Sequence, residues 1–207
     1  MTDLGLMHYC LGVEVWQQSS SLFISRSKYT KALLDKFCMQ DCKLASAPME
    51  KGLKSLAKFN SPPVDDTTYR QLVGSLIYLS TTRPDISFAV SYISCFMIAP
   101  KVDHWMTAKC VLCYVKGTSH YRLLYSWSSN PWLSGFIDSD WAGSIDNKKS
   151  TYGYVFGLES VAVTWTSKKQ QAISLSYTQG RLWSYLASSN AWGYADVTNK
   201  TKHFVSW

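Results

Sequence analysis

Hydrophobic positions near the start of the chain alternate and then change to a helical period. Residues 8–16 carry apolar side chains at about every second position, and residues 22–25 resume this pattern after a polar turn at 17–21. A period of two is typical of strands, so we predict a β-hairpin. Residues 27–37 repeat apolar side chains at helical spacing, with Ser27 as a candidate N-cap.

The outer face of this first helix is basic, because it carries Lys28, Lys31 and Lys36. Such a face is usually an ordinary solvated helix surface. It also suits contacts with a nucleic-acid backbone, so the pattern leaves both interpretations open.

A helical region is predicted between residues 65 and 118, after an irregular, proline-containing segment at 43–66. Its first helix covers residues 69–79. The second begins at Arg83-Pro84-Asp85, where proline occupies the first helical turn, and the third runs from Asp103 to Gly117.

From residue 121 the pattern returns to strands, and a helix follows from Ser174. Strands succeeded by a helix indicate an α+β arrangement, so α+β is the expected fold class. The strand candidates are residues 123–125, 133–138, 153–158 and 161–166.

Composition adds a preference for a polyanionic partner. The 207 residues are 46% hydrophobic and carry a formal net charge of +7, which favours nucleic acid. No apolar run is long enough to span a membrane, and Met1-Thr-Asp-Leu-Gly5 does not resemble a signal peptide. We therefore expect an intracellular protein, in the cytoplasm or the nucleus, that has no membrane partner and no small-molecule substrate.

The cysteines do not form a metal-binding pattern. Cys110-Val-Leu-Cys113 is a lone CxxC in an apolar helical stretch, and no second pair accompanies it. We expect buried free thiols and a reducing environment, with a metal or redox site as the alternative. The six positions are Cys10, Cys38, Cys42, Cys95, Cys110 and Cys113.

The candidate chemistry lies in Leu133-Ser-Gly-Phe-Ile-Asp-Ser-Asp-Trp-Ala-Gly143. This stretch predicts a strand that brings Asp138 and Asp140 to a turn, where carboxylates can hold a divalent metal. The alternative is an Asp pair that only opens the turn, since Asp is a preferred turn residue.

Several long motifs occur in one order along the chain. The sequence resembles the C-terminal part of the Pol polyprotein of copia-type LTR retrotransposons, a family abundant in plants, from the end of reverse transcriptase through ribonuclease H. The matching segments are His8-Tyr-Cys-Leu-Gly-Val-Glu14, Tyr69-Arg-Gln-Leu-Val-Gly-Ser-Leu-Ile-Tyr-Leu79, Thr82-Arg-Pro-Asp-Ile86, Tyr114-Val-Lys-Gly-Thr118, Asp138-Ser-Asp-Trp-Ala-Gly143, Lys149-Ser-Thr-Tyr-Gly-Tyr154 and Trp165-Thr-Ser-Lys-Lys-Gln170.

The resemblance implies cleavage of the RNA strand of an RNA–DNA hybrid by acidic residues that hold two Mg²⁺ ions. It assigns the first metal-binding Asp to Asp138. The next acid is expected in a Ser-Ser-Thr-Glu-Ala-Glu-Tyr motif, but this chain reads Ser176-Tyr-Thr-Gln-Gly-Arg-Leu182. Gln179 replaces the metal-binding Glu and Arg181 replaces the second one, and both changes weaken divalent binding.

Two further elements of the family are not found. An Asp-Asn segment on the strand after that helix should supply the third acid, and Asp196 is a poor substitute at the wrong spacing. The polymerase Tyr-x-Asp-Asp motif is also missing, because Asp65-Asp66 lies in a proline-rich loop with no strand before it.

We therefore expect a degenerate, catalytically inactive Pol remnant with weak affinity for RNA–DNA hybrid or other nucleic acid, through Lys148, Lys149, Lys168 and Lys169. Mg²⁺ would not bind tightly. The alternatives are an active ribonuclease H that uses Asp138, Asp140 and an unrecognised acid, and a host-recruited interaction module that uses exposed aromatic side chains.

The expected organisation follows from the resemblance. Residues 1–60 would be a thumb-like remnant of reverse transcriptase, residues 65–118 a helical connection, and residues 121–207 a truncated ribonuclease H-like domain. That domain would hold an incomplete mixed sheet and one packed helix, and its open sheet edge predicts marginal stability.

Overall fold

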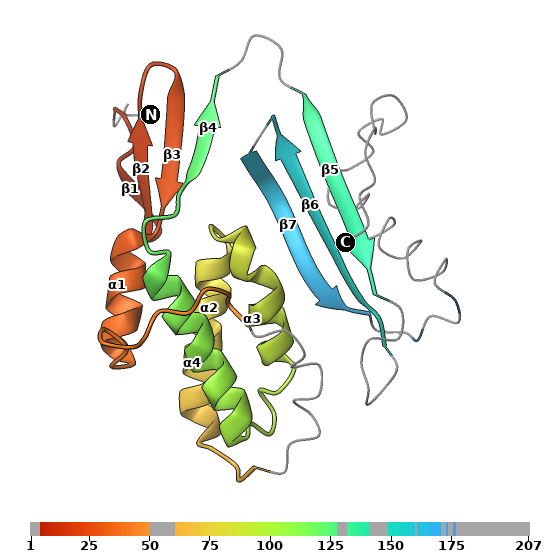
Figure 1. Ribbon diagram of the computed structural model, residues 1–207. Coiled ribbons are helices and arrows are strands. Elements are labelled where there is room, and N and C mark those ends of the chain that lie inside the picture. Colours follow the sequence, from red (N-terminus) through yellow and green to blue (C-terminus); the bar gives the residue numbers. More distant parts are fainter. Residues whose placement is uncertain are drawn as a thin grey trace. The chain divides into compact units, whose positions relative to one another are not determined.

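The computed structural model describes residues 5–49, 61–127, 132–140, 149–159 and 161–170, together with Ile173 and Ser176. The chain divides into two compact units (Figure 1). The first comprises residues 1–53 and 59–129, and the second comprises residues 54–58 and 130–207. Helices and antiparallel strands both occur, which confirms the α+β class.

A four-stranded antiparallel sheet opens the first unit. The predicted hairpin is confirmed, but its first half contains an additional turn at Leu11 and Gly12, where φ is 47° and 73°. Gly12 suits this conformation, and the Tyr78 hydroxyl lies only 2.8 Å from the position that a Cβ would take there. The strands follow the order β1 (Tyr9–Cys10), β2 (Val13–Gln17), β3 (Ser21–Ser25) and β4 (Leu123–Ser126).

The fourth strand of this sheet comes from the other end of the unit. The sequence pattern grouped Leu123–Tyr125 with the final domain, whereas β4 pairs with β3 through Phe23 and Leu124. A strand period shows which faces are apolar but does not identify the neighbouring strand, so this long-range pairing was not predictable.

The described residues of the first unit also form four helices and one short 3-10 helix. Pro84 occupies the first turn of η2, as the sequence predicted. The apolar faces of the helices form one core, whose fully buried members include Tyr69, Leu72 and Leu112. The elements are α1 (Ser27–Lys36), α2 (Asp66–Ser80), η2 (Pro84–Ile86), α3 (Ser87–Ser94) and α4 (Val102–Gly117).

The start of α1 differs from the predicted Ser27 cap. Arg26 occupies the N-cap position and makes no side-chain capping bond. The carboxylate of Glu14 on β2 instead accepts the Lys28 backbone N–H at 3.1 Å and the Ser25 hydroxyl at 3.4 Å. Glu14 is distant in sequence from the helix, so local capping rules did not identify it.

The second unit contains a three-stranded antiparallel sheet in the order β5–β6–β7. Gly135 lies beneath the Phe156 ring, whose nearest atom is 2.5 Å from the position of an added Cβ, so only glycine fits there. The predicted helix from Ser174 lies outside the described residues. The strands are β5 (Leu133–Ser139), β6 (Thr151–Leu158) and β7 (Val161–Lys169).

The aromatic side chains do not all lie in the core. Tyr69 is fully buried, whereas Trp127 is 72% exposed and Trp132 is 56% exposed. Both tryptophans flank strand ends, where a strand period does not determine burial. None of the described helices is long and apolar enough to cross a membrane.

Truncation of a core leucine on α2 should destabilise the first unit strongly. Leu76 is fully buried, so Leu76→Ala removes packed methyl groups and leaves a cavity that costs about 2–5 kcal/mol. The neighbouring Ile77 is 43% exposed, so Ile77→Ala serves as the control and should cost less than about 1 kcal/mol. Urea unfolding followed by tryptophan fluorescence measures both, and equal losses would contradict the described core.

Candidate functional site

Asp138 lies near the end of β5 and is exposed. It pairs with Gly153 on β6, which in turn pairs with Ser167 on β7. Because directly paired residues project to the same face, these three positions share one face of the sheet. One Asp138 oxygen, Oδ1, accepts the backbone N–H of Ser139 at 2.8 Å, so the second oxygen is the one available to a ligand.

Asp140 has a local structural role at the end of the sheet. Its backbone N–H donates to the Thr151 carbonyl oxygen at 3.0 Å, and its Oδ1 accepts the Thr151 N–H. The carboxylate therefore continues the hydrogen-bond ladder between β5 and β6 past the last residue of β5. This contact reduces its capacity to serve as a metal ligand, since Oδ1 is already engaged.

The described donor set does not suit a two-magnesium centre. Mg²⁺ needs oxygen ligands in octahedral geometry, and two-metal hydrolysis uses several carboxylates around both ions. Asp138 and Asp140 offer two carboxylates, each with Oδ1 bonded to a backbone amide. Within the described ranges, no group of three or more His, Cys, Asp or Glu side chains is placed to hold a metal.

The predicted lysines do not all lie on the face of Asp138. Lys169 pairs with Thr151, two positions from Gly153, and so shares that face, whereas Lys168 pairs with Tyr152 and projects from the opposite face. Lys149 lies just before β6. The other predicted site residues lie outside the described residues: Lys148, Gln179, Arg181 and Asp196.

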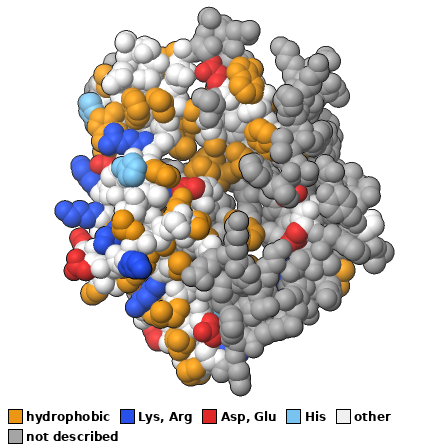
Figure 2. All heavy atoms as spheres, viewed as in Figure 1, with side chains coloured by type: hydrophobic (Ala, Val, Ile, Leu, Met, Phe, Trp, Pro, Cys, Tyr) orange, Lys and Arg blue, Asp and Glu red, His pale blue; other side chains and the backbone are white. Residues whose placement is uncertain are grey.

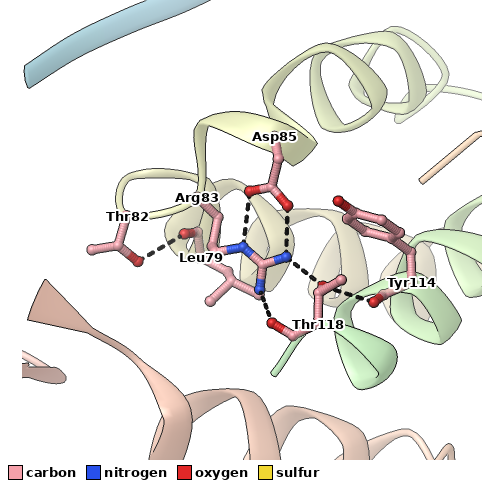
Figure 3. A network of polar contacts seen from close by, with 6 residues as sticks. All are labelled: Leu79, Thr82, Arg83, Asp85, Tyr114 and Thr118. Carbon is pink, nitrogen blue, oxygen red and sulfur yellow. Dashed lines mark hydrogen bonds and ion pairs between the residues drawn. The ribbon is translucent and has the colours of Figure 1, made fainter. Parts of the chain in front are cut away.

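A second cluster joins two motifs that the resemblance singled out without giving them a role. Arg83 binds the Asp85 carboxylate with two nitrogens, at 2.8 Å from Nε and 2.6 Å from Nη2 (Figure 3). Its Nη1 also donates to the Thr118 carbonyl oxygen at 3.0 Å, and Nη2 donates to the Thr118 hydroxyl at 2.5 Å. The turn between α2 and α3 is thereby fixed to the C-terminus of α4.

The same cluster contains a tyrosine with a shifted ionisation. Burial raises the pKa of Tyr114, and the Asp85 carboxylate raises it further through its charge and a hydrogen bond. The Thr118 hydroxyl donates to the Tyr114 carbonyl oxygen at 2.8 Å, which ties the last turn of α4 together. Arg83 is only 5% exposed, so its guanidinium serves to join the two helical segments.

Sequence reasoning missed the link between these motifs. The sequence shows Arg83-Pro84-Asp85 at the start of one helix and Gly117-Thr118 at the end of a later one. That signal gives no register between the two segments, so their contact depends on how α3 and α4 pack.

The chain is similar to several proteins of plant genomes. It is 38% identical over 179 residues to an uncharacterised mitochondrial protein of Arabidopsis thaliana, a match that covers 86% of this chain and 74% of that protein. It is 36% identical over 198 residues to the retrovirus-related Pol polyprotein from transposon TNT 1-94 of Nicotiana tabacum, covering 91% of this chain and 15% of the polyprotein. It is also 36% identical over 184 residues to the retrovirus-related Pol polyprotein from transposon RE2 of Arabidopsis thaliana. That match covers 89% of this chain and 13% of the polyprotein.

No protein-family model matches the chain. No solved structure matches it.

Loss of the Arg83 guanidinium should destabilise the first unit. Arg83→Met leaves Asp85 and the Thr118 groups without their buried partner, at a cost of about 2–3 kcal/mol. The exposed ion pair of Arg70 with Asp66 provides the matched control, because its side chains are 51% and 46% exposed and Arg70→Met should cost less than about 1 kcal/mol. Equal shifts of the two urea midpoints would show that the Arg83 cluster does not stabilise the packing.

Proposed function

Because the chain belongs to the copia-type retrotransposon Pol polyprotein family, we propose that it is a Pol-derived protein without ribonuclease H activity that retains weak, sequence-independent affinity for nucleic acid. The chain spans about one seventh of the Pol polyproteins it matches, so their activities are not transferred as a whole. On this proposal, residues 130–207 correspond to a ribonuclease H-like domain, and the first unit corresponds to the end of reverse transcriptase.

The identity of residue 179 carries the proposal. The family places a metal-binding Glu at this position, and this chain has Gln179, which offers one neutral oxygen and no charge. Arg181 adds a cation two residues later. Divalent binding depends on the negative charge of the ligand set, so both substitutions oppose the retention of two Mg²⁺ ions.

The described geometry supports the same conclusion. Asp138 and Asp140 each have one oxygen engaged by a backbone amide. A third acid would have to come from outside the described ranges, and the sequence contains no Asp-Asn segment after Leu182, where that role would place it. The alternative of an active enzyme therefore depends on an acid that neither the motifs nor the described residues supply.

The positions of several lysines support the proposed affinity for nucleic acid. Lys169 shares the face of Asp138 and can approach a phosphate of a nucleic acid laid on that face. The first unit adds the exposed lysines of α1, namely Lys28, Lys31 and Lys36, which form no ion pair among the described residues. Figure 2 shows basic side chains gathered along the margin of the view where Figure 1 places α1.

The purified chain should not cleave a labelled RNA–DNA hybrid in Mg²⁺ or in Mn²⁺. Its rate should equal that of Asp138→Asn, because the ligand set is already deficient in charge. Circular dichroism and a cooperative thermal transition establish that both proteins are folded. Cleavage that Asp138→Asn abolishes would instead establish an active ribonuclease H.

Binding of the hybrid should depend on which face a lysine occupies. Lys169→Gln should weaken binding and reduce the slope of log affinity against log salt by about one, since one phosphate contact is lost. Lys168 projects from the other face, so Lys168→Gln is the matched control. This variant should leave the slope of log affinity against log salt unchanged. Fluorescence anisotropy over a salt series measures both, and equal effects would exclude the Asp138 face as the contact surface.

A further inference from the structure

The two outer strands of the second unit's sheet differ in features that protect a sheet edge. In the order β5–β6–β7, β7 carries Lys168 and Lys169 and has a register irregularity opposite Phe156 and Gly157. Lysines and irregular pairing are common means of keeping an edge strand from joining another strand. β5 has neither, because Leu133–Ser139 contains no lysine, arginine or proline and its register with β6 is regular throughout.

β5 is also long and apolar for an edge strand (Figure 1). It has seven residues, whereas the outer strands of the first unit's sheet, β1 and β4, have two and four. Leu133 is 43% exposed and Phe136 is 44% exposed. A long, regular and apolar edge is the kind that pairs with a strand of another chain.

The backbone of β5 directs every second residue away from β6. At one end the Trp132 carbonyl oxygen accepts the Glu159 N–H at 2.7 Å, and at the other end the Asp140 N–H donates to the Thr151 carbonyl oxygen at 3.0 Å. Alternate residues of an antiparallel strand bond to the same neighbour, so the even-numbered residues bond to β6. The outer edge, which no described strand covers, presents the backbone groups of Leu133, Gly135, Ile137 and Ser139.

We propose that the outer edge of β5 is a dimerisation surface, where β5 of a second copy of this chain pairs antiparallel and joins the two sheets into one. The partner is a second copy because β5 is complementary to itself under a two-fold axis, as an isologous interface requires. This inference goes beyond the proposed function and does not rest on it.

A two-fold axis through Phe136 pairs the strand over its full length. Gly135 then lies opposite Ile137 of the second copy, and Leu133 lies opposite its Ser139. All four positions direct their backbone groups to the outer edge, so these are the hydrogen-bonded pairs of the new ladder. The pairing converts two exposed edges into the interior of a continuous sheet.

The aromatic side chain at the axis meets its own copy. Phe136 occupies a position between hydrogen-bonded pairs, where opposite side chains approach most closely. Its ring would pack against the Phe136 ring of the second copy, and aromatic pairs of this kind are favourable across strands. The ring surface that is exposed in the single chain would thereby be buried on both copies.

The one charge of β5 is also accommodated in this register. Asp138 lies opposite Ser134 of the second copy, so the two carboxylates stay at opposite ends of the interface. Asp138 Oδ1 accepts the Ser139 N–H at 2.8 Å, which leaves its second oxygen for the Ser134 hydroxyl. In the single chain that hydroxyl donates to the Gly157 carbonyl oxygen at 3.3 Å, a long bond that an ionised acceptor can replace.

The test measures self-association of the full chain by analytical ultracentrifugation over a concentration series. The wild type should form a reversible dimer. Phe136→Lys places two ammonium groups opposite each other and should raise the dimer dissociation constant about tenfold or more. Val155→Lys is the matched control, because Val155 pairs with Phe136, is 38% exposed and lies on the interior strand β6. The control should change the constant less than about threefold.

Cross-linking tests the register. Opposite residues between hydrogen-bonded pairs have Cα atoms about 4.5 Å apart, which a disulfide can span. Oxidised Phe136→Cys should therefore form a covalent dimer through the introduced thiols, whereas Val155→Cys should not. Peptide mass spectrometry distinguishes this linkage from those of the native cysteines.

Three results would overturn the proposal: a monomer at every concentration, a dimer that Phe136→Lys leaves unchanged, or equal weakening by both lysine variants. A monomer would be the result if another part of the same chain covers the edge. Circular dichroism first establishes that each variant folds. If Phe136→Lys does not fold, the cross-link of Phe136→Cys decides.

Discussion

The buried guanidinium of Arg83 is the contact on which the packing of the first unit depends. It binds Asp85 within its own turn and both oxygens of Thr118 at the end of α4. A buried arginine is stabilising only when its donors are satisfied, so the turn, the helix end and the core must form together. This requirement gives a physical role to two motifs of the family, in the unit that contains none of the predicted ribonuclease H residues.

The second unit differs, because its described elements form a three-stranded antiparallel sheet. The strands bring Asp138 to an exposed position and extend the ladder through Asp140. On the proposed function, Asp138 would belong to a hydrolytic centre whose negative charge Gln179 and Arg181 lower. The same proposal makes the affinity for nucleic acid electrostatic.

The basic groups of the first unit illustrate how packing changes the meaning of a sequence pattern. Along the chain, Lys116 is one more basic residue near the end of α4, whereas in the fold its Nζ donates to the Cys42 carbonyl oxygen at 2.8 Å. In the sequence, the lysines of α1 form an ordinary solvent-exposed helix face. In the structure, the Nζ of Lys28 lies 5.6 Å from the centre of the Tyr9 ring, and the Nζ of Lys36 lies 5.5 Å from the centre of the Phe37 ring. Such contacts hold a cation at the surface without an acidic partner.

The sequence by itself determined the elements and the family. Apolar periods located α2, α3, α4 and the strands from Leu133 onward, because local burial patterns reflect whether a segment is helix or strand. The motifs, including the one around Asp138, identified the Pol relationship, and the residue types at 179 and 181 predict a metal site with too little negative charge, since ligand chemistry depends on residue identity. Each of these conclusions needs only local information.

The tertiary structure alone decided the long-range partners. It paired β4 with β3, assigned the cap of α1 to Glu14, placed Lys168 and Lys169 on opposite faces, and joined Lys116 to the Cys42 carbonyl oxygen. Each of these depends on strand register or helix packing between segments that are separate in sequence. A hydrophobic pattern specifies that a face must be covered, but the covering partner is selected by the packing of the whole unit.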